Sequence, residues 1–296
     1  MPELRADTPP SEWWAGGERV TLAINGVDRN IFIRTDGDGP IVTILHGYPS
    51  SSWDWVPVIS LVGGRCRTVC FDFLGFGASD KPAEHGYSID EQADVVDAVW
   101  AELGVTETIL VAHDYGATVG QEMLARRADG LGPLIHSSLW LNGGLYPEAH
   151  RPTDGQKALL DDTIGPEISA AMTPELFGAG FSVVFGDRTK PSEADLAQHW
   201  AVVSRDDGNA RLHDLLHYIA DRREHRERYL GAFEAVEPAP WLIWGLADPV
   251  SGDHMLEPVR AGRPEIRVTE LADIGHYPQL ESAGAVAAAI DELVSM

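Results

Sequence analysis

Short apolar runs rich in β-branched residues alternate along the chain with amphipathic stretches. The apolar runs at residues 20–23, 30–34, 41–45, 68–71, 137–141, 241–244 and 266–271 have the length and composition of strands, mostly buried. Helical spacing of apolar residues follows Ser88, which with Glu91 fits a capping box, and recurs over residues 283–294. This alternation predicts an α/β fold with a mostly parallel, doubly wound sheet.

The alternation of strands and helices stops between residues 145 and 231. Polar helical segments punctuated by prolines, such as residues 192–204 and 209–230, replace it. We interpret this part as a helical cap inserted into the α/β core. The predicted organisation is a core domain of residues 1–144 and 232–296 and a cap domain of residues 145–231.

An aspartate stands where one predicted strand turns into a helix. Asp114 lies at this bend, and the small residues Ala112 and Gly116 stand two positions to either side. A sharp strand-to-helix elbow tolerates almost no side chain at those positions. We therefore predict that Asp114 is a nucleophile above the carboxyl edge of the sheet. The N–H of Tyr115 would open the helix as a free donor.

Two further polar residues each follow a predicted strand. They are Asp248 and His276, and the order Asp114, Asp248, His276 along the chain is that of the α/β-hydrolase triad: nucleophile, acid, base. Since the carboxyl ends of parallel strands meet at one edge of a sheet, we expect the three side chains to converge there. His113, inside the elbow, is expected to support the turn and to point away from the site.

The residue type of the nucleophile indicates the class of reaction. A carboxylate attacks an sp³ carbon and leaves an alkyl-enzyme ester, whereas a serine would attack a carbonyl. His276 would activate the water that hydrolyses this ester, and Asp248 would orient its imidazole. The backbone N–H groups of Tyr48 and Tyr115 are the predicted oxyanion hole. The pattern therefore argues against an esterase or peptidase.

The charge of the chain excludes some partners. The sequence has 22 basic and 46 acidic residues, a net charge of −24, which repels nucleic acids and anionic membranes.

The cysteines, the N-terminus and the histidines bound the cellular context and the cofactors. Cys66 and Cys70, the only cysteines, are expected to be reduced core residues. Residues 1–17 show neither a signal peptide nor a membrane span, so we expect a cytoplasmic protein. The histidines lack metal-ligand spacing, and no metal or cofactor is predicted.

Several stretches of the sequence resemble the epoxide hydrolase and haloalkane dehalogenase branch of the α/β-hydrolases. They are residues 46–49, 72–82, 113–116 and 273–280. Within that branch, residues 142–144, 147–152 and 205–209 resemble the mesoderm-specific transcript group. The resemblance implies an α/β-hydrolase fold with a cap and places the nucleophile, acid and base on Asp114, Asp248 and His276.

The resemblance also implies how the two chemistries of this branch differ. Dehalogenases usually carry Trp and Asn as halide donors, at positions where this chain has Tyr115 and Tyr48. Epoxide hydrolases protonate the epoxide oxygen with cap tyrosines. Tyr218 stands at the spacing of the later cap tyrosine, although an ordinary core aromatic on an amphipathic helix is an equally good interpretation of this residue. Tyr146 is a candidate for the earlier cap tyrosine.

We therefore predict a cofactor-free epoxide hydrolase that converts a small apolar epoxide to a vicinal diol, acting as a monomer or homodimer with substrate and water as its partners. One alternative is a haloalkane dehalogenase with the same ester intermediate, in which Trp53 or Trp200 donates to the halide. Another is a ligand-binding protein without catalysis. The candidate pocket walls are Trp53, Trp55, Phe177, Phe181 and Trp200, with Tyr146 as a further substrate-binding residue.

Overall fold

The computed structural model describes residues 4–296, which form one eight-stranded sheet. Its strands are β1 (Glu18–Ile24), β2 (Val27–Asp36), β3 (Ile41–Leu45), β4 (Arg67–Phe71), β5 (Glu107–His113), β6 (Leu134–Leu141), β7 (Trp241–Gly245) and β8 (Arg267–Leu271). The spatial order is β1-β2-β4-β3-β5-β6-β7-β8. Strand β2 is antiparallel to both of its neighbours, β1 and β4, and the pairs from β4 to β8 are parallel. The predicted fold class is confirmed.

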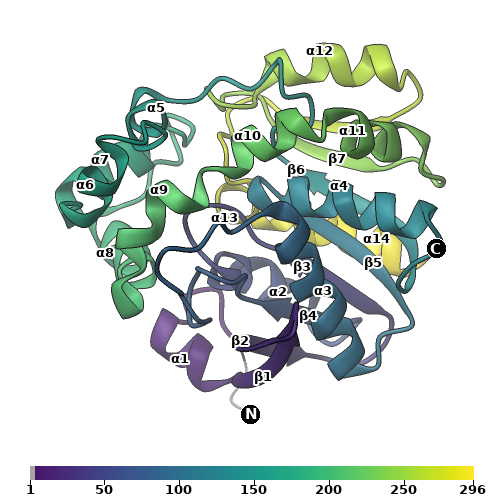
Figure 1. Cartoon of the computed structure of the whole chain (residues 1–296). Coiled ribbons are helices and arrows are strands. Elements are labelled where there is room, and N and C mark those ends of the chain that lie inside the picture. The colour runs from purple at the N-terminus through teal and green to yellow at the C-terminus, as the bar shows by residue number, and fades with distance from the viewer. Residues whose placement is uncertain (1–3) are drawn as a thin grey trace.

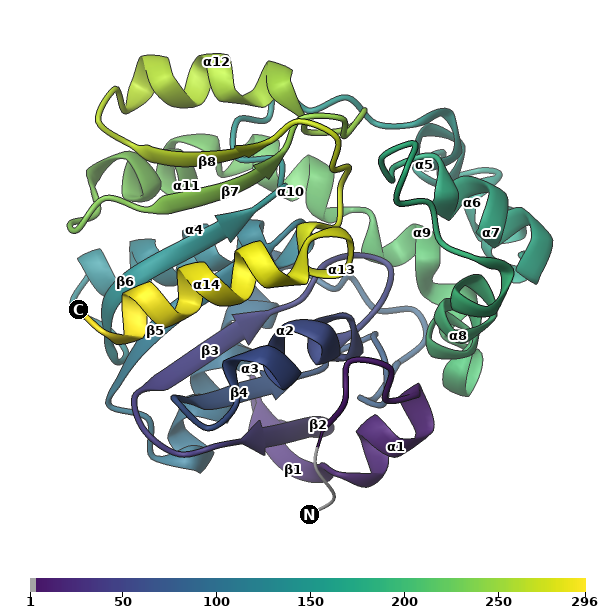
Figure 2. The same ribbon diagram turned by 180° about the vertical axis from the view of Figure 1, so that it is seen from behind.

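Helices cover both faces of the sheet (Figures 1 and 2). On one face α2 (Val56–Val62) packs against α14 (Ala283–Val294), and on the other α3 (Ile89–Leu103) and α11 (Arg226–Ala235) pack against α4 (Tyr115–Ala128). Two apolar clusters fill the spaces between the sheet and these helices. Because neither face meets water, central strands such as β3 and β7 are apolar at almost every position rather than alternating.

The remaining helices of the core lie at the ends or edges of the sheet. They are α1 (Pro10–Ala15), the short 3₁₀ helix η1 (Ser52–Trp55), α12 (Asp253–Gly262) and α13 (Pro278–Glu281). At the start of α3, Ser88 accepts a hydrogen bond from the N–H of Glu91, but the Glu91 carboxylate pairs with His85. Only half of the expected capping box therefore forms. Between residues 4 and 296, no helix has both the length and the apolar character needed to cross a membrane.

A series of mostly short helices connects β6 to β7, and all but the last, which packs on α4, stand beside the carboxyl ends of the strands (Figures 1 and 2). They are α5 (Asp154–Leu159), α6 (Gly165–Ala170), α7 (Pro174–Ser182), α8 (Glu193–Val203), η2 (Arg205–Arg211), α9 (Leu212–Leu215), α10 (Tyr218–Glu224) and α11. The helix expected over residues 192–204 is α8, which a capping box of Ser192 and Asp195 begins.

The single helix expected over residues 209–230 is wrong. The chain instead forms α9, α10 and α11, with turns at residues 216–217 and at His225. These turns change the direction in which the buried side chains point. Leu212 faces a cavity, Tyr218 reaches the elbow, and α11 packs on α4. The expected boundary of the cap at residue 231 falls inside α11.

Candidate active site

The elbow between β5 and α4 holds Asp114 in a strained conformation. Its φ of 48° and ψ of −109° lie where L-residues are rare. The N–H of Asp114 donates to the carbonyl of Asn142, and the N–H of Gly116 donates to the carbonyl of His46, both at 3.0 Å. A Cβ atom on Gly116 would lie 2.5 Å from the carbonyl oxygen of Leu45. Because β3 lies so close, a side chain at position 116 would clash with its backbone. This contact explains the glycine from which the elbow was predicted.

Three donors surround the carboxylate of Asp114. Oδ2 accepts the backbone N–H of Tyr48 at 2.9 Å. Oδ1 lies 3.3 Å from the hydroxyl of Tyr218 and 3.6 Å from Nε2 of His276. Burial raises the pKa of Asp114, but the facing imidazolium and the N–H of Tyr48 outweigh it and hold the pKa well below its usual range. Asp114 is therefore ionised, as a nucleophilic carboxylate must be.

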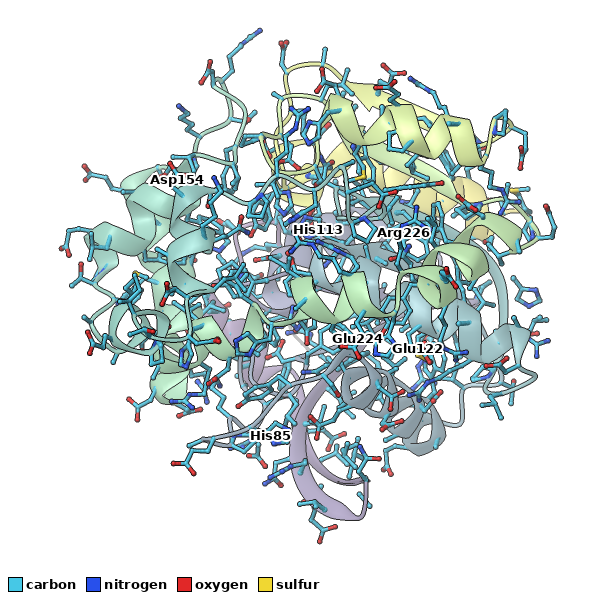
Figure 3. All side chains as sticks on the ribbon, turned by 45° about the horizontal axis from the view of Figure 1, so that its top comes forward. His85, His113, Glu122, Asp154, Glu224 and Arg226 are labelled. Carbon is cyan, nitrogen blue, oxygen red and sulfur yellow. The ribbon has the colours of Figure 1, made fainter. Side chains whose placement is uncertain are left out.

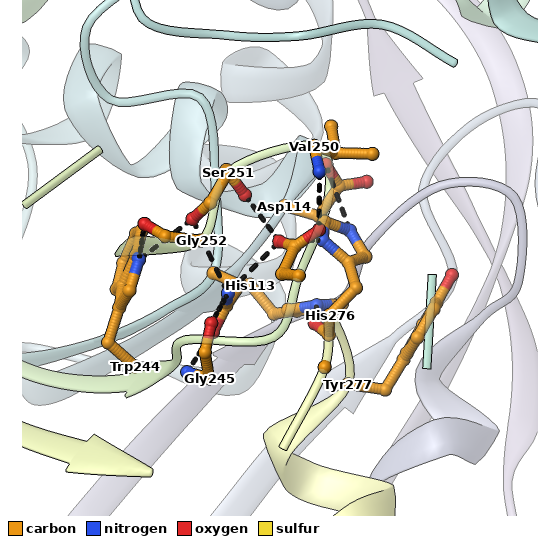
Figure 4. Close-up of polar contacts among 12 residues, drawn as sticks. His113, Asp114, Trp244, Gly245, Val250, Ser251, Gly252, His276 and Tyr277 are labelled. Atoms are coloured by element: carbon orange, nitrogen blue, oxygen red, sulfur yellow. Dashed lines mark hydrogen bonds and ion pairs between the residues drawn. The ribbon is translucent and has the colours of Figure 1, made fainter. Parts of the chain in front are cut away.

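Asp248 orients the imidazole of His276. Figure 4 shows His276 with Asp114 and the segment from Val250 to Gly252 around it. The Oδ2 of Asp248 accepts from Nδ1 of His276 at 2.7 Å, from Nδ2 of Asn142 at 3.0 Å and from the hydroxyl of Ser251 at 2.8 Å. Its Oδ1 accepts the N–H of Val250 at 2.7 Å. Burial raises the pKa of Asp248, but these contacts and the charge of His276 lower it overall. The fixed carboxylate leaves Nε2 of His276 facing Asp114, 3.6 Å from its Oδ1.

His276 lies between two carboxylates and is protonated in the resting protein. Burial lowers its pKa, but the charges and hydrogen bonds of Asp248 and Asp114 raise it to about 10. At neutral pH the imidazolium therefore neutralises part of the buried negative charge. A protonated imidazole cannot accept a proton from water, so any role of His276 as a base requires that the negative charge facing it is first removed.

His113 supports the loop that carries the base. Its Nε2 lies 2.7 Å from the carbonyl oxygen of His276, and its Nδ1 lies 3.0 Å from the amide nitrogen of Gln279. Burial lowers the pKa of His113 to about 3, so the ring is neutral. With Gln279 donating to Nδ1, the hydrogen on Nε2 donates to His276. His113 thus contacts the loop of the base and does not line the cavity in front of Asp114.

The two predicted oxyanion donors differ in what they contact. The N–H of Tyr48 already donates to Oδ2 of Asp114. The N–H of Tyr115 stands at the first position of α4 and has no acceptor among residues 4–296. The side chain of Tyr115 turns away and packs against Phe73, Phe76 and Tyr218. If Oδ1 attacks the substrate, Oδ2 becomes the carbonyl oxygen of the ester, and Tyr48 is already placed to bind it.

A cavity of about 280 Å³ opens in front of Asp114 and His276. Its walls are mostly apolar, and they come from the core through Tyr48 and Tyr277 and from the cap helices. The cap residues include Leu159, Ile168, Met172, Leu176, Phe177, Phe181 and Leu212. An apolar cavity beside an ionised carboxylate suits a small apolar molecule.

Of the predicted pocket walls, only Phe177 and Phe181 line this cavity. Trp200 packs behind Phe177, with ring centroids 5.7 Å apart. The indole of Trp53 donates to the carbonyl oxygen of Thr8. Trp55 and Tyr146 also lie elsewhere, Trp55 buried in the cluster beneath the α2 face and Tyr146 donating to Glu234 at 2.6 Å. The backbone directions of the cap and of η1 turn these aromatic side chains away from Asp114.

Sequence reasoning missed Asn142 and Tyr277. Oδ1 of Asn142 accepts the N–H of Gly245 at 2.7 Å, while its Nδ2 binds Asp248, so Asn142 joins the ends of β6 and β7. The hydroxyl of Tyr277 donates to the carbonyl oxygen of Tyr48 at 2.9 Å. The sequence signal for Asn142 was a polar residue at the end of the strand beside the elbow.

Within residues 4–296, no group of three or more His, Cys, Asp or Glu side chains could hold a metal ion.

Comparison with known proteins identifies the family. The model of the alpha/beta hydrolase fold matches residues 40–283. The mesoderm-specific transcript homolog protein of Bos taurus is 43% identical over 253 residues, covering 83% of this chain and 76% of that protein. Haloalkane dehalogenase 2 of Mycobacterium tuberculosis (strain ATCC 25618 / H37Rv) is 26% identical over 261 residues, covering 87% of this chain and 88% of that protein.

A solved structure shares the fold. The crystal structure of the haloalkane dehalogenase DatA from Agrobacterium tumefaciens C58 superposes with a TM-score of 0.75 at 19% identity, covering 95% of this chain and 97% of that one. The family model and the 43% identical relative together cover most of the sequence. The chain therefore belongs to the α/β-hydrolase family and is similar within it to the mesoderm-specific transcript proteins.

Proposed function

We propose that this α/β-hydrolase is an epoxide hydrolase in which Asp114 is the nucleophile. The observation that carries the proposal is the hydroxyl of Tyr218, which lies 3.3 Å from Oδ1 of Asp114. A phenol beside the nucleophile supplies the acid that an epoxide oxygen needs and a halide does not. In-line attack requires the substrate carbon between the two groups, so substrate binding has to part the phenol from the carboxylate.

In the first step, Oδ1 of Asp114 attacks an epoxide carbon and the C–O bond breaks. The electron pair goes to the epoxide oxygen, which takes the proton of Tyr218. The resulting phenolate recovers a proton from His276, whose Nε2 faces the same carboxylate oxygen at 3.6 Å. The products of this step are an ester on Asp114, a neutral phenol and a neutral imidazole. The base is thus prepared by the step that precedes its use.

In the second step, neutral His276 takes a proton from water, which attacks the ester carbonyl. Negative charge develops on Oδ2, where the N–H of Tyr48 lies in the resting protein. Such a donor commonly contributes about 3 kcal/mol to the transition state. When the tetrahedral intermediate collapses, the diol leaves with the proton from the nascent carboxylic acid. Asp114 returns as a carboxylate and His276 as an imidazolium, which restores the resting charges.

The second candidate is a haloalkane dehalogenase, which a 26% identical relative of that name favours. It would use the same ester and the same apolar cavity. A leaving halide needs N–H donors at the cavity. The two tryptophans considered as donors lie elsewhere: Trp53 donates to Thr8, and Trp200 stands behind Phe177. This difference is the reason that we rank the epoxide reaction first.

The test is the intact mass of the His276→Ala variant after incubation with styrene oxide or with 1-bromobutane. Without the base, the ester on Asp114 should accumulate. An adduct with the mass of the whole epoxide supports the proposal, and an alkyl adduct with release of bromide would move the assignment to a dehalogenase. The matched control is Asp114→Asn in the same background, which should form no adduct. A folded protein without adducts across a panel of both substrate classes refutes both enzymatic assignments and favours a ligand-binding protein.

A further inference from the structure

A buried arginine with no salt-bridge partner among residues 4–296 stands beside the proposed acid. Arg222 lies one turn after Tyr218 on α10 and is 1% exposed, whereas its neighbours Glu224 and Arg226 are exposed (Figure 3). Nη1 lies 3.4 Å from the hydroxyl of Thr118. Nε and Nη2 have no hydrogen-bond partner within residues 4–296. Burying a charge in this way is unfavourable unless another charge compensates it.

The surroundings of Arg222 leave room for the guanidinium, and no carboxylate of the described residues forms a salt bridge with it. A Cβ atom on Gly144 would overlap Nη1, so the glycine allows the arginine to approach the backbone. His150 is buried beside it, with no partner for either ring nitrogen among the described residues. Burial and the charge of Arg222 hold the pKa of His150 well below its ordinary value, so the ring is neutral.

The guanidinium lies over the ring of Tyr218, with Cζ 5.2 Å from the ring centroid. A cation over an aromatic face is attracted to the ring, and more strongly when the ring carries a negative charge. The other titratable groups that act on Tyr218 are Asp114 and Tyr48, and the ring of Tyr115 contacts it at 4.8 Å. The imidazolium of His276 is a second cation near the phenol, since its Nε2 lies 3.6 Å from the Asp114 oxygen that Tyr218 contacts. His276 gives up its proton during the proposed first step, whereas Arg222 keeps its charge.

We infer that Arg222 is a positioning residue that stabilises the negative charge on Tyr218 while the phenol transfers its proton to the epoxide oxygen. The inference rests on the proposed function. Burial and Asp114 both raise the pKa of Tyr218, and Arg222 opposes them. Before ring opening, the negative charge of Asp114 acts on this buried cation without a direct contact. As the ester forms and that charge disappears, the developing phenolate replaces it, so one negative charge acts on Arg222 throughout the step.

The test compares two substitutions of Arg222. Arg222→Met keeps a long side chain without charge, and Arg222→Lys keeps the charge. In single-turnover experiments with styrene oxide, Arg222→Met should slow formation of the ester by about 10- to 100-fold, and Arg222→Lys should restore most of the rate. Hydrolysis of the ester should change little in either variant, because that step uses His276. Circular dichroism and thermal unfolding check that both variants fold.

A second measurement separates an electrostatic role from a merely structural one. Difluorotyrosine at position 218 has a more acidic phenol, so it should restore part of the rate that Arg222→Met loses. A loss without this rescue, an equal loss in both steps, or a rate like that of wild type would overturn the inference. If wild type itself forms no ester with epoxides, the proposed function fails and the inference fails with it. Wild-type turnover with an unaffected Arg222→Met variant refutes the inference alone.

Discussion

Replacing Asp114 by asparagine should convert His276 into a base at neutral pH. The substitution keeps the shape of the side chain but removes the charge, as ester formation does. Nε2 of His276 lies 3.6 Å from Oδ1 of Asp114. Two unit charges at that distance attract by about 4–5 kcal/mol at an effective dielectric constant of 20. Since 1.36 kcal/mol corresponds to one pKa unit, the pKa of His276 should fall by about 3.

The pKa of His276 is about 10 in wild type, so we expect a value of about 7 in the Asp114→Asn variant. Proton-detected ¹⁵N spectra of the histidine rings, recorded from pH 5 to pH 11, measure both values, and a His276→Gln variant assigns the resonance. The matched control is Asp154→Asn, which makes the same change at a fully exposed side chain and should leave His276 unaffected. If the pKa of His276 falls by less than about 1 in Asp114→Asn, the electrostatic pairing of Asp114 with His276 is refuted, together with the order of steps built on it.

Two further predictions follow from the same geometry. In weak buffer at pH 8, esterification of Asp114 by 1-bromobutane should release about one proton per site, because His276 loses its charge. Esterification by an epoxide should release no proton, because the epoxide oxygen takes it. A pH indicator in stopped flow measures proton release in both reactions, and equal release would contradict the charges assigned to Asp114 and His276. Gly116→Ala should lower the free energy of unfolding in urea by about 1–3 kcal/mol or more, because the new Cβ atom would meet the backbone of Leu45. Gly284→Ala, at a helical position with open space around it, should cause no loss, and similar losses in both variants would contradict this account.

The strands and the elbow could be predicted because their causes are local. Both faces of the sheet are covered, so the strands are continuous apolar runs, and β3 over Ile41–Leu45 has the predicted bounds. At the elbow, the contact between Gly116 and β3 demands a glycine, which the sequence displays directly. The positions of Asp248 and His276 followed from strands that end at one edge of the sheet.

The walls of the cavity could not be predicted in the same way. Whether a cap aromatic faces the nucleophile depends on where the helices break, and the turns at residues 216–217 and at His225 leave no apolar pattern. Tyr218 reaches Asp114, while Tyr146 donates to Glu234, although both are tyrosines of the same segment. The role of Asn142 depends on β6 and β7 being neighbours, which is a property of the tertiary structure.

The cavity has a wall from the core and a wall from the cap. In the core wall, the hydroxyl of Tyr277 donates a hydrogen bond to the carbonyl of Tyr48. This hydrogen bond joins the loop that carries His276 to the loop that carries Tyr48. A substitution in the core wall therefore changes the geometry of these two residues as well as the shape of the cavity. The cap side, represented by Leu176 and Phe177, contributes apolar side chains to the wall, and Phe177 packs on Phe181 and Trp200 of the cap itself. A library of variants intended to change which substrates fit should therefore vary the cap side and leave Tyr277 intact.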